Sequence, residues 1–348
     1  ILSPPTLPRR KESGIMNIYD IAKLAGVSIA TVSRVVNDSP KVSEKTKEKV
    51  RAVMAANDYI PNVFARGMSL NSMKTVGIIC PSVSDHYMAS AVAYLEKNLR
   101  NYGYDCILYC SGYEQEDKEI SVQMILQKRI DALLLVGSCY AGDKEYGEDI
   151  TYIKKASEEI PVFIMNGFID GENIYCMLTD DYQSVYDAAS AMIASGREQI
   201  LFLSDSYSYS AMHKLKGYED ALKAADIPVL GERKVYIKNE IHLVRDILLA
   251  RKDLEFDGVI ATDDGLAVGA VKYARAKKLS VPQDISIIGY NNSELSIGCE
   301  PELSSIDSRG DLLCKMTIDS LMEVLKGESM EHRKYVQCRL EKRCTTDF

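Results

Sequence analysis

The chain has 348 residues, enough for two or three domains, and its 50 Asp and Glu against 42 Lys and Arg give a net charge of −8. No apolar run is long enough for a signal-peptide core or a membrane span, so neither an exported protein nor a membrane protein is indicated. The nine cysteines include no C-x-x-C pair, and we interpret them as reduced thiols of a cytoplasmic protein, with no disulfide or zinc site.

The N-terminal part of the chain is basic, although the whole is acidic. Residues 1–74 carry 12 Lys and Arg against 6 Asp and Glu, a balance of +6, which leaves −14 for residues 75–348. We therefore expect a polyanion to bind the N-terminal part and to be repelled by the remainder. Residues 1–15 contain three prolines and a short basic run, and we expect them to be a disordered extension before Met16.

Residues 17–37 predict two short helices around a tight turn. Asn17 can cap a helix over residues 18–25, because its side chain can accept hydrogen bonds from the free amides of the first turn. Gly26 can adopt the left-handed conformation that ends this helix, and Ser28 can cap the next one. The apolar residues expected to pack between the helices are Ile21, Ala22 and Leu24 in the first and Val32, Val35 and Val36 in the second.

A third helix over residues 44–57 is expected after Ser43, with its apolar residues Val50, Val53 and Met54 packed on the first two. Three short helices bury little surface, so this unit has a small core. Two helices around a glycine turn, the second lined with small side chains, are typical of a helix-turn-helix that reads DNA.

This region resembles the DNA-binding headpiece of the LacI/GalR family of bacterial transcription regulators. The resemblance rests on Ala-Gly-Val-Ser at 25–28, Thr-Val-Ser-Arg-Val-Val-Asn at 31–37, and the hinge-helix phrases Tyr-Ile-Pro-Asn at 59–62 and Ala-Arg at 65–66. It implies a helix-turn-helix domain over 16–60, a hinge helix and linker over 61–74, and sequence-specific DNA binding, most often as a repressor. A helical hairpin that serves only as core is the alternative.

The resemblance implies DNA contacts for individual residues. Ile29 and Ala30 would touch thymine methyl groups and Arg34 would bond to guanine, a combination most similar to the catabolite control protein branch of the family. Met68 stands where relatives insert a leucine into the minor groove, so we expect a hinge that is disordered without DNA and an operator that is kinked. Seven residues match phosphate-contacting positions: Tyr19, Ser28, Thr31, Ser33, Asn37, Ser43 and Asn62. For Ile29, a buried core position is the alternative.

From Thr75 onward, short apolar strands alternate with helical segments. One series of strands is expected at 75–80, 106–110, 132–136 and 162–165, and a second at 200–203, 258–262 and 285–289. Alternation of this kind predicts two lobes, each with a parallel sheet flanked by helices. The resemblance, which extends over the whole chain from Met16, implies a periplasmic-binding-protein-like sensor. Its first lobe would comprise 75–178 and 305–333, its second 179–304 and 334–348, with crossings near Thr179, Ser304 and Lys334.

A small-molecule effector would bind between the lobes, at the carboxyl ends of the strands. The resemblance implies six effector-binding residues: Asp85, Tyr87, Asn166, Lys214, Asp264 and Asn291. Several depart from the family pattern, since Asn166 replaces an aspartate, Lys214 an arginine and Asn291 an aspartate. Sugars are usually held by charged groups and an aromatic face, so a sugar or another metabolite is implied. Lys214 facing Asp264 would either hold a polar ligand or close the lobes as an ion pair.

No phosphate-binding loop, nucleophile elbow or metal-binding motif occurs, and we expect no enzymatic activity, cofactor or metal. His86 and His213 are expected to line the cleft as polar groups. The segment 204–210 is either a mobile rim loop or a lid.

We expect a homodimer on a pseudo-palindromic operator, controlled by a small ligand or a partner protein that changes lobe closure. No heptad repeat follows the last strand, which favours a dimer over a tetramer. The alternative is a solute-binding protein without DNA function.

Overall fold

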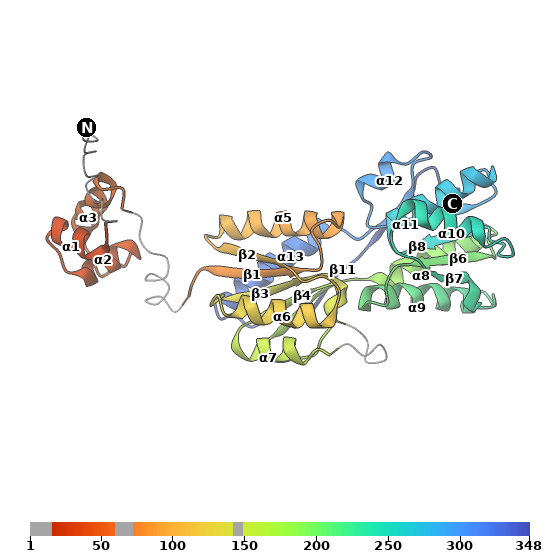
Figure 1. Ribbon diagram of the computed structural model, residues 1–348. Coiled ribbons are helices and arrows are strands. Elements are labelled where there is room, and N and C mark those ends of the chain that lie inside the picture. Colours follow the sequence, from red (N-terminus) through yellow and green to blue (C-terminus); the bar gives the residue numbers. More distant parts are fainter. Residues whose placement is uncertain (1–15, 60–71, 142–148) are drawn as a thin grey trace, which may run out of the picture. The chain divides into compact units, whose positions relative to one another are not determined.

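The computed structural model describes residues 16–59, 72–141 and 149–348. The chain divides into two compact units, residues 1–73 and residues 74–348, which are called the headpiece and the body below (Figure 1). The expected extension, the hinge helix and the two site residues Asn62 and Met68 lie outside the described residues.

The headpiece is built from three helices, α1 (Ile18–Ala25), α2 (Ile29–Val36) and α3 (Glu44–Ala56). Asn17 and Asp20 form a capping box at the start of α1, and Gly26 ends it at φ 60°. The buried residues of the core are Ile21, Ala22, Ala25, Val32, Val35 and Val50. Leu24 was expected in this core but is 55% exposed. Ile21 and Ala25 lie one helical turn apart and occupy the buried stripe, which turns Leu24 toward solvent.

A small ion-pair cluster joins α3 to the preceding loop. The ammonium group of Lys47 lies 3.0 Å from the Asp38 carboxylate and 2.9 Å from that of Glu44, and Arg51 lies 2.7 Å from Asp38. The hydrogen bond from Lys47 and its charge hold the pKa of Asp38 below its usual value. This cluster fixes the loop between the recognition helix α2 and α3.

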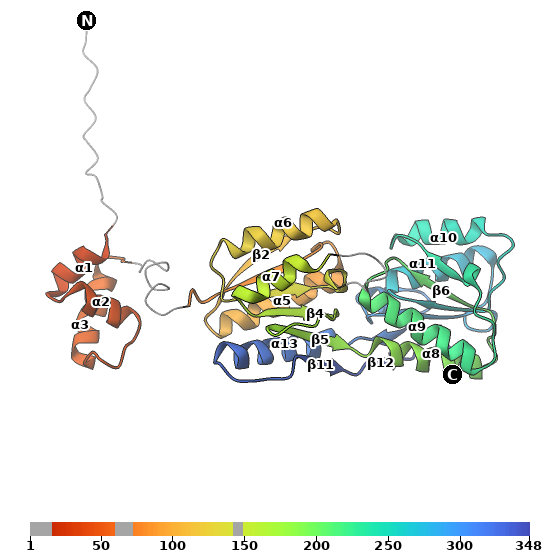
Figure 2. The same ribbon diagram turned by 90° about the horizontal axis from the view of Figure 1, so that it is seen from below.

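The body contains two six-stranded sheets (Figures 1 and 2). The first has the order β11-β5-β4-β3-β1-β2 and the second the order β12-β10-β9-β8-β6-β7. The strands of the first sheet are β1 (Thr75–Cys80), β2 (Asp105–Cys110), β3 (Ala132–Val136), β4 (Val162–Met165), β5 (Ile174–Thr179) and β11 (Arg333–Val336). Those of the second are β6 (Ile200–Ser204), β7 (Lys234–Tyr236), β8 (Gly258–Ala261), β9 (Ser286–Tyr290), β10 (Ser304–Asp307) and β12 (Arg339–Glu341).

Adjacent strands pair in parallel, except for the antiparallel pair of β10 and β12. The described α-helices of the body are α5 (His86–Asn101), α6 (Gln115–Leu126), α7 (Thr151–Glu159), α8 (Asp181–Ala194), α9 (Tyr209–Ala224), α10 (Ile241–Ala250), α11 (Asp264–Lys277), α12 (Glu294–Gly298) and α13 (Gly310–Leu325). Short 3₁₀ turns occur at Ser138–Tyr140 and Gly231–Arg233.

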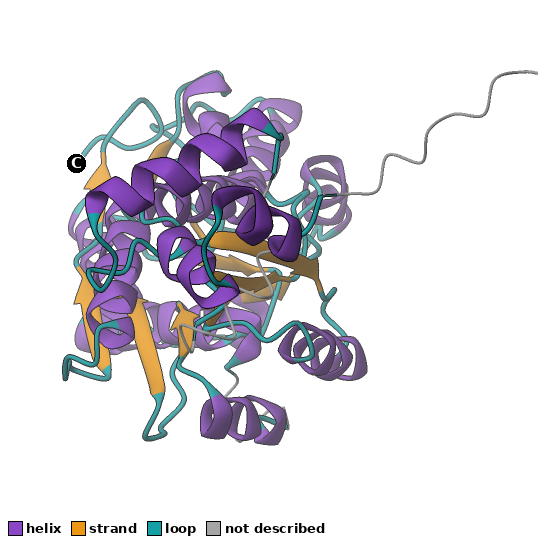
Figure 3. Ribbon diagram, turned by 90° about the vertical axis from the view of Figure 1, so that its left-hand side faces the viewer, coloured by secondary structure: helices purple, strands orange, loops and turns teal. Residues whose placement is uncertain are grey.

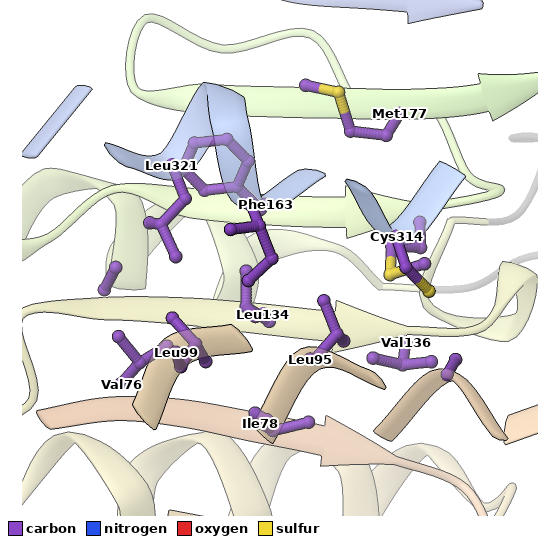
Figure 4. Packing of buried hydrophobic residues seen from close by; sticks show 14 of the residues in the cluster. Val76, Ile78, Leu95, Leu99, Leu134, Val136, Phe163, Met177, Cys314 and Leu321 are labelled. Atoms are coloured by element: carbon purple, nitrogen blue, oxygen red, sulfur yellow. The ribbon is translucent and has the colours of Figure 1, made fainter. Parts of the chain in front are cut away.

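Helices cover both faces of each sheet, and Figure 3 distinguishes the helices from the strands by colour. In the first lobe, α5 and α13 pack on one face, where Leu95, Leu321 and Phe163 meet (Figure 4), and α6 and α7 pack on the other. In the second lobe, α10 and α11 cover one face, and α8 and α9 the other. Every residue of β3 is buried, as expected for a central strand covered on both sides.

The chain crosses between the lobes where β5 ends, between β10 and α13, and between β11 and β12. The first crossing lies at Thr179, as the sequence led us to expect. The other two lie later than expected, after Asp307 and Val336, because all of β10 pairs in the second sheet and all of β11 in the first. No described helix has both the length and the apolar character needed to cross a membrane.

Candidate nucleic-acid interface and ligand cleft

Helix α2 is fixed at its start by a serine cap. The Ser28 hydroxyl accepts a hydrogen bond from the Thr31 amide at 3.1 Å and lies 2.8 Å from the Thr31 hydroxyl. Val32 and Val35 bury the inner side of the helix against α1 and α3. The opposite side is therefore held in one orientation and left open to solvent.

The three residues expected to read bases lie on this open side. Ile29 is 40% exposed, so it is not the core residue that the alternative required, and Ala30 and Arg34 are also exposed. Within the described residues the guanidinium group of Arg34 makes no hydrogen bond or ion pair. An unpaired guanidinium beside two small apolar side chains is suited to a guanine next to a thymine methyl group.

Six of the seven expected phosphate-contacting residues are described, and all six are half-buried or exposed; all but Ser33 lie near a helix start or end. Tyr19 lies in the first turn of α1, Asn37 is the C-cap of α2, and Ser43 is the N-cap of α3. Ser33 is half-buried on α2, whereas the hydroxyls of Ser28 and Thr31 contact each other. Exposed helix starts offer amides and hydroxyls to anions, which agrees with phosphate contacts there.

In the body, a chain of hydrogen bonds connects the two lobes. The Asn166 amide donates to the Tyr87 phenol at 2.8 Å, and the Thr179 hydroxyl lies 3.2 Å from Asn166 Oδ1 and 2.9 Å from Asp181 Oδ1. Tyr290 of the second lobe donates its phenol hydrogen to the same Asp181 oxygen. Tyr87 and Asn166 thus belong to one polar network with the first crossing. Asp181 and Tyr290 were not found from the sequence.

The two adjacent carboxylates at the end of β8 have different surroundings. Asp263 caps α11 and accepts hydrogen bonds from Asn239 and Asn291 at 2.7 and 3.0 Å. Asp264 is 1% exposed, and its two oxygens accept from Ser305 at 2.6 Å and from the amide and hydroxyl of Ser293 at 2.6 and 2.8 Å. Both oxygens of Asp264 therefore already accept hydrogen bonds from protein donors in this structure, and its expected role as an effector ligand stays a prediction.

Lys214 does not face Asp264 as expected. It is 7% exposed, its ammonium group donates to the Thr262 carbonyl oxygen at 3.3 Å, and it lies 3.5 Å from the centre of the Tyr290 ring. The expected ion pair with Asp264 is not formed among the described residues, whereas a ligand shared by the two residues stays a prediction. The buried charge is stabilised instead by a carbonyl dipole and an aromatic face, which couples Lys214 to the network through Tyr290.

Three carboxylates interact across the cleft at the carboxyl ends of β1, β6 and β8. Burial raises the pKa of Asp85, the N-cap of α5, and the negative charge of Asp263 raises it further. Burial also raises the pKa of Asp205 to about 6, again with the help of Asp263, while Lys214 opposes the shift. Asp85 of the first lobe therefore faces the negative charges of Asp205 and Asp263 of the second lobe.

A cavity of about 360 Å³ lies at the edge of the crossings rather than among the expected effector residues. Its walls include Thr179, Asp181, Tyr209, His213 and Tyr335. His213 lines this cavity and packs against Tyr209, with the two rings tilted by 32° and their centres 4.0 Å apart, whereas His86 is exposed. The segment 204–210 ends β6 and begins α9, and Tyr207 in it stacks on Tyr236 at 4.1 Å.

Comparisons with known proteins match both units. Residues 17–62 fit the family described as bacterial regulatory proteins, lacI family, and residues 189–346 fit the periplasmic binding protein-like domain. A transcriptional regulator of the helix-turn-helix type from Lachnoclostridium phytofermentans is 46% identical over 96% of this chain and 100% of its own length. The chain belongs to the lacI family of bacterial regulatory proteins.

Two further lacI-family comparisons agree with the architecture. Catabolite control protein A of Priestia megaterium is 32% identical over 84% of this chain and 87% of its own. The crystal structure of the lac repressor dimer bound to operator and the anti-inducer ONPF superposes with a TM-score of 0.84 at 24% identity, covering 95% of this chain and 99% of that one. This chain is therefore a DNA-binding transcriptional regulator with a ligand-responsive sensor body, and the alternative of a solute-binding protein without DNA function is set aside.

Proposed function

We propose that this regulator reads its operator with Ile29, Ala30 and Arg34 of α2 and binds phosphates through Tyr19, Ser28, Thr31, Ser33, Asn37, Ser43 and Asn62, with Met68 as the minor-groove wedge. The exposed, unpaired Arg34 on a helix fixed by Ser28 is the observation that carries the proposal. We also infer a homodimer on a pseudo-palindromic operator, a cytoplasmic location that follows from the DNA target, and no enzymatic activity.

The first test compares Arg34→Ala with Arg100→Ala, a matched control on α5 of the body. In mobility-shift titrations, Arg34→Ala should weaken operator binding by about 1–3 kcal/mol and relax the preference at one base pair. Arg100→Ala should leave binding unchanged, and both proteins should lose affinity steeply as salt rises. An equal loss on specific and random DNA would rule out base reading by Arg34.

For the effector, we propose a sugar or another polar metabolite that binds between the lobes against Asp85, Tyr87, Asn166, Lys214 and Asn291. Support comes from the hydrogen-bond network from Tyr87 to Tyr290, which crosses the hinge and includes two of these residues. A ligand that bonds to the network in one closure state would shift the population toward that state and change DNA affinity reciprocally.

Calorimetry against sugars, purines and phosphorylated metabolites tests this assignment. Tyr87→Phe removes the phenol oxygen that accepts from Asn166, and it should weaken effector binding by roughly threefold to tenfold. Tyr102→Phe, an exposed position at the end of α5, is the control and should bind as the wild type does. Unchanged binding by Tyr87→Phe would place the effector elsewhere, for example in the cavity near Tyr209.

A further inference from the structure

Two cysteines stand opposite each other at the ends of adjacent strands. Cys80 ends β1, Cys110 ends β2, and the two residues are partners in the parallel register. The pairing continues beyond the strands, because the Ser111 amide donates to the Cys80 carbonyl oxygen at 3.0 Å and the Gly112 amide to that of Pro81 at 2.9 Å. The strand ends are thus held together on both sides of the thiols.

The register places the Cα atoms of the two cysteines at a separation that a disulfide bond can span. Neighbouring strands lie about 4.8 Å apart, which falls within the range of about 4.4–6.8 Å between the Cα atoms of linked cysteines. Partners in register project their side chains from the same face of the sheet, so the thiols of Cys80 and Cys110 lie on one face. Little movement of the backbone is needed to join them.

The two thiols differ in their access to solvent. Cys110 is exposed on the edge strand β2, whereas Cys80 is fully buried in the core of the first lobe. Burial raises the pKa of Cys80 to about 12, and the neighbouring Cys110 adds to the shift. Cys110 is therefore the thiol that meets an oxidant, and Cys80 is placed to react with it afterward.

We propose that Cys80 and Cys110 form an oxidisable dithiol at the rim of the ligand cleft, a modification site that closes to an intramolecular disulfide. With a hydroperoxide as oxidant, the Cys110 sulfur attacks the terminal peroxide oxygen and the O–O bond breaks, giving a sulfenic acid and an alcohol or water. The Cys80 sulfur then attacks the Cys110 sulfur, the S–O bond breaks, and the hydroxyl leaves as water with the Cys80 proton. Two thiols supply the two electrons that reduce the peroxide.

The position of the pair connects it to the cleft. The loop that follows Cys80 leads directly to Asp85, which caps α5, and to Tyr87 of the interlobe network. A disulfide fixes the start of this loop to β2. The oxidised protein should therefore bind the cleft ligand with a different affinity from the reduced one, a consequence beyond the function proposed above.

Mass analysis of the full-length protein after mild hydrogen peroxide tests the site without DNA or effector. The wild type should lose two hydrogens, retain seven of its nine free thiols, and yield a peptide linking residues 80 and 110. Reduction with dithiothreitol should restore all nine free thiols. Cys106→Ser is the matched control, since Cys106 lies on the same strand with Val76 as partner, and it should still form the link.

Two variants separate the oxidation of Cys110 from the closure of the disulfide bond by Cys80. Cys110→Ser should form no link, and Cys80→Ser should accumulate a sulfenic acid at residue 110 that dimedone traps. Thermal unfolding provides a second readout, because the closed loop should raise the melting temperature of oxidised wild type and of Cys106→Ser, but not of Cys110→Ser. Nine free thiols in wild type after peroxide, or a link that pairs Cys110 with another cysteine, would overturn the proposal.

Discussion

At the scale of single residues, the second lobe shows how surroundings assign different roles to neighbouring carboxylates. Asp263 lies at the cleft with amide partners, whereas Asp264 is enclosed by Ser293 and Ser305 and joins the loop after β9 to β10. A sequence shows that two aspartates follow a strand, but it does not show which one turns inward. This is why the sequence could show two carboxylates after the strand but not the buried surroundings of Asp264.

We predict that Asp264→Ala is strongly destabilising. The substitution removes the acceptor of the Ser293 amide, of the half-buried Ser293 hydroxyl and of the buried Ser305 hydroxyl, and each lost partner costs about 1–3 kcal/mol. Urea unfolding should therefore show a loss of about 3 kcal/mol or more. The exposed Asp253→Ala serves as control and should change stability little; equal stability of the two variants would contradict the assigned role.

We predict a pH-dependent contribution from Asp205. Its pKa of about 6 in the folded protein exceeds the ordinary 3.8, so the folded state binds this proton more tightly than the unfolded state. Stability from this group is therefore present at low pH and is lost as the pH rises from about 4 to 6.

The Asp205→Asn variant has no ionisable group at residue 205, whereas Asp264 and the other carboxylates remain in both the variant and the wild type. Comparing the two proteins therefore isolates the pH dependence that comes from Asp205. The free energy of unfolding of the wild type relative to Asp205→Asn should fall between pH 4 and 6 and stay level above pH 7. Urea unfolding at a series of pH values measures this difference. A difference that is constant, or that rises with pH, would show that the carboxylate is not desolvated.

At the scale of elements, hydrophobic patterning predicted the helices of the headpiece and seven strands of the body. Continuous apolar runs such as Ala132–Val136 are unmistakable because both faces of the strand are buried. The short strands β7, β10, β11 and β12 contain polar or charged residues and lie at or near sheet edges, so their extent depends on pairing partners that are distant in sequence. Two of the three crossings were misplaced by a few residues for the same reason.

Helices α8 and α9 pack closely, and we predict that Gly217→Ala disrupts this contact. A Cβ atom at Gly217 would overlap the carbonyl oxygen of Tyr182 and approach the Tyr186 amide nitrogen at 3.1 Å. Because the obstructing atoms are backbone, the helices must separate, at a cost of about 1–3 kcal/mol. Gly298→Ala, where no atom lies within 4 Å of the added carbon, should be nearly neutral in thermal unfolding.

The Gly217→Ala variant should also affect the hinge. Tyr182 follows the first crossing, and α9 begins beside Ser208, whose hydroxyl lies 2.9 Å from that of Ser138 in the first lobe. A shift of α9 would therefore alter a contact between the lobes as well as the core of the second lobe. If Gly217→Ala were as stable as Gly298→Ala, the close approach of α8 and α9 would not be present in solution.

At the scale of the whole molecule, a basic DNA-reading headpiece and an acidic two-lobed body form one regulator. The division of charge and the headpiece motif could be predicted from the sequence because both depend on neighbouring residues. The interlobe network of Tyr87, Asn166, Thr179, Asp181 and Tyr290 could not, because it joins residues from strands that meet only in the folded body. We propose that a small ligand acts on this network to bias lobe closure and thereby DNA affinity.

The central claim, that the headpiece recognises a specific DNA sequence, is tested most directly by selection from random duplex oligonucleotides with the full-length protein. We predict that the wild-type protein enriches an inverted repeat. The Arg34→Ala variant should enrich a repeat that differs at one base pair of each half-site. If a folded, dimeric protein enriched no sequence motif among the random oligonucleotides, the claim of specific DNA recognition would be contradicted.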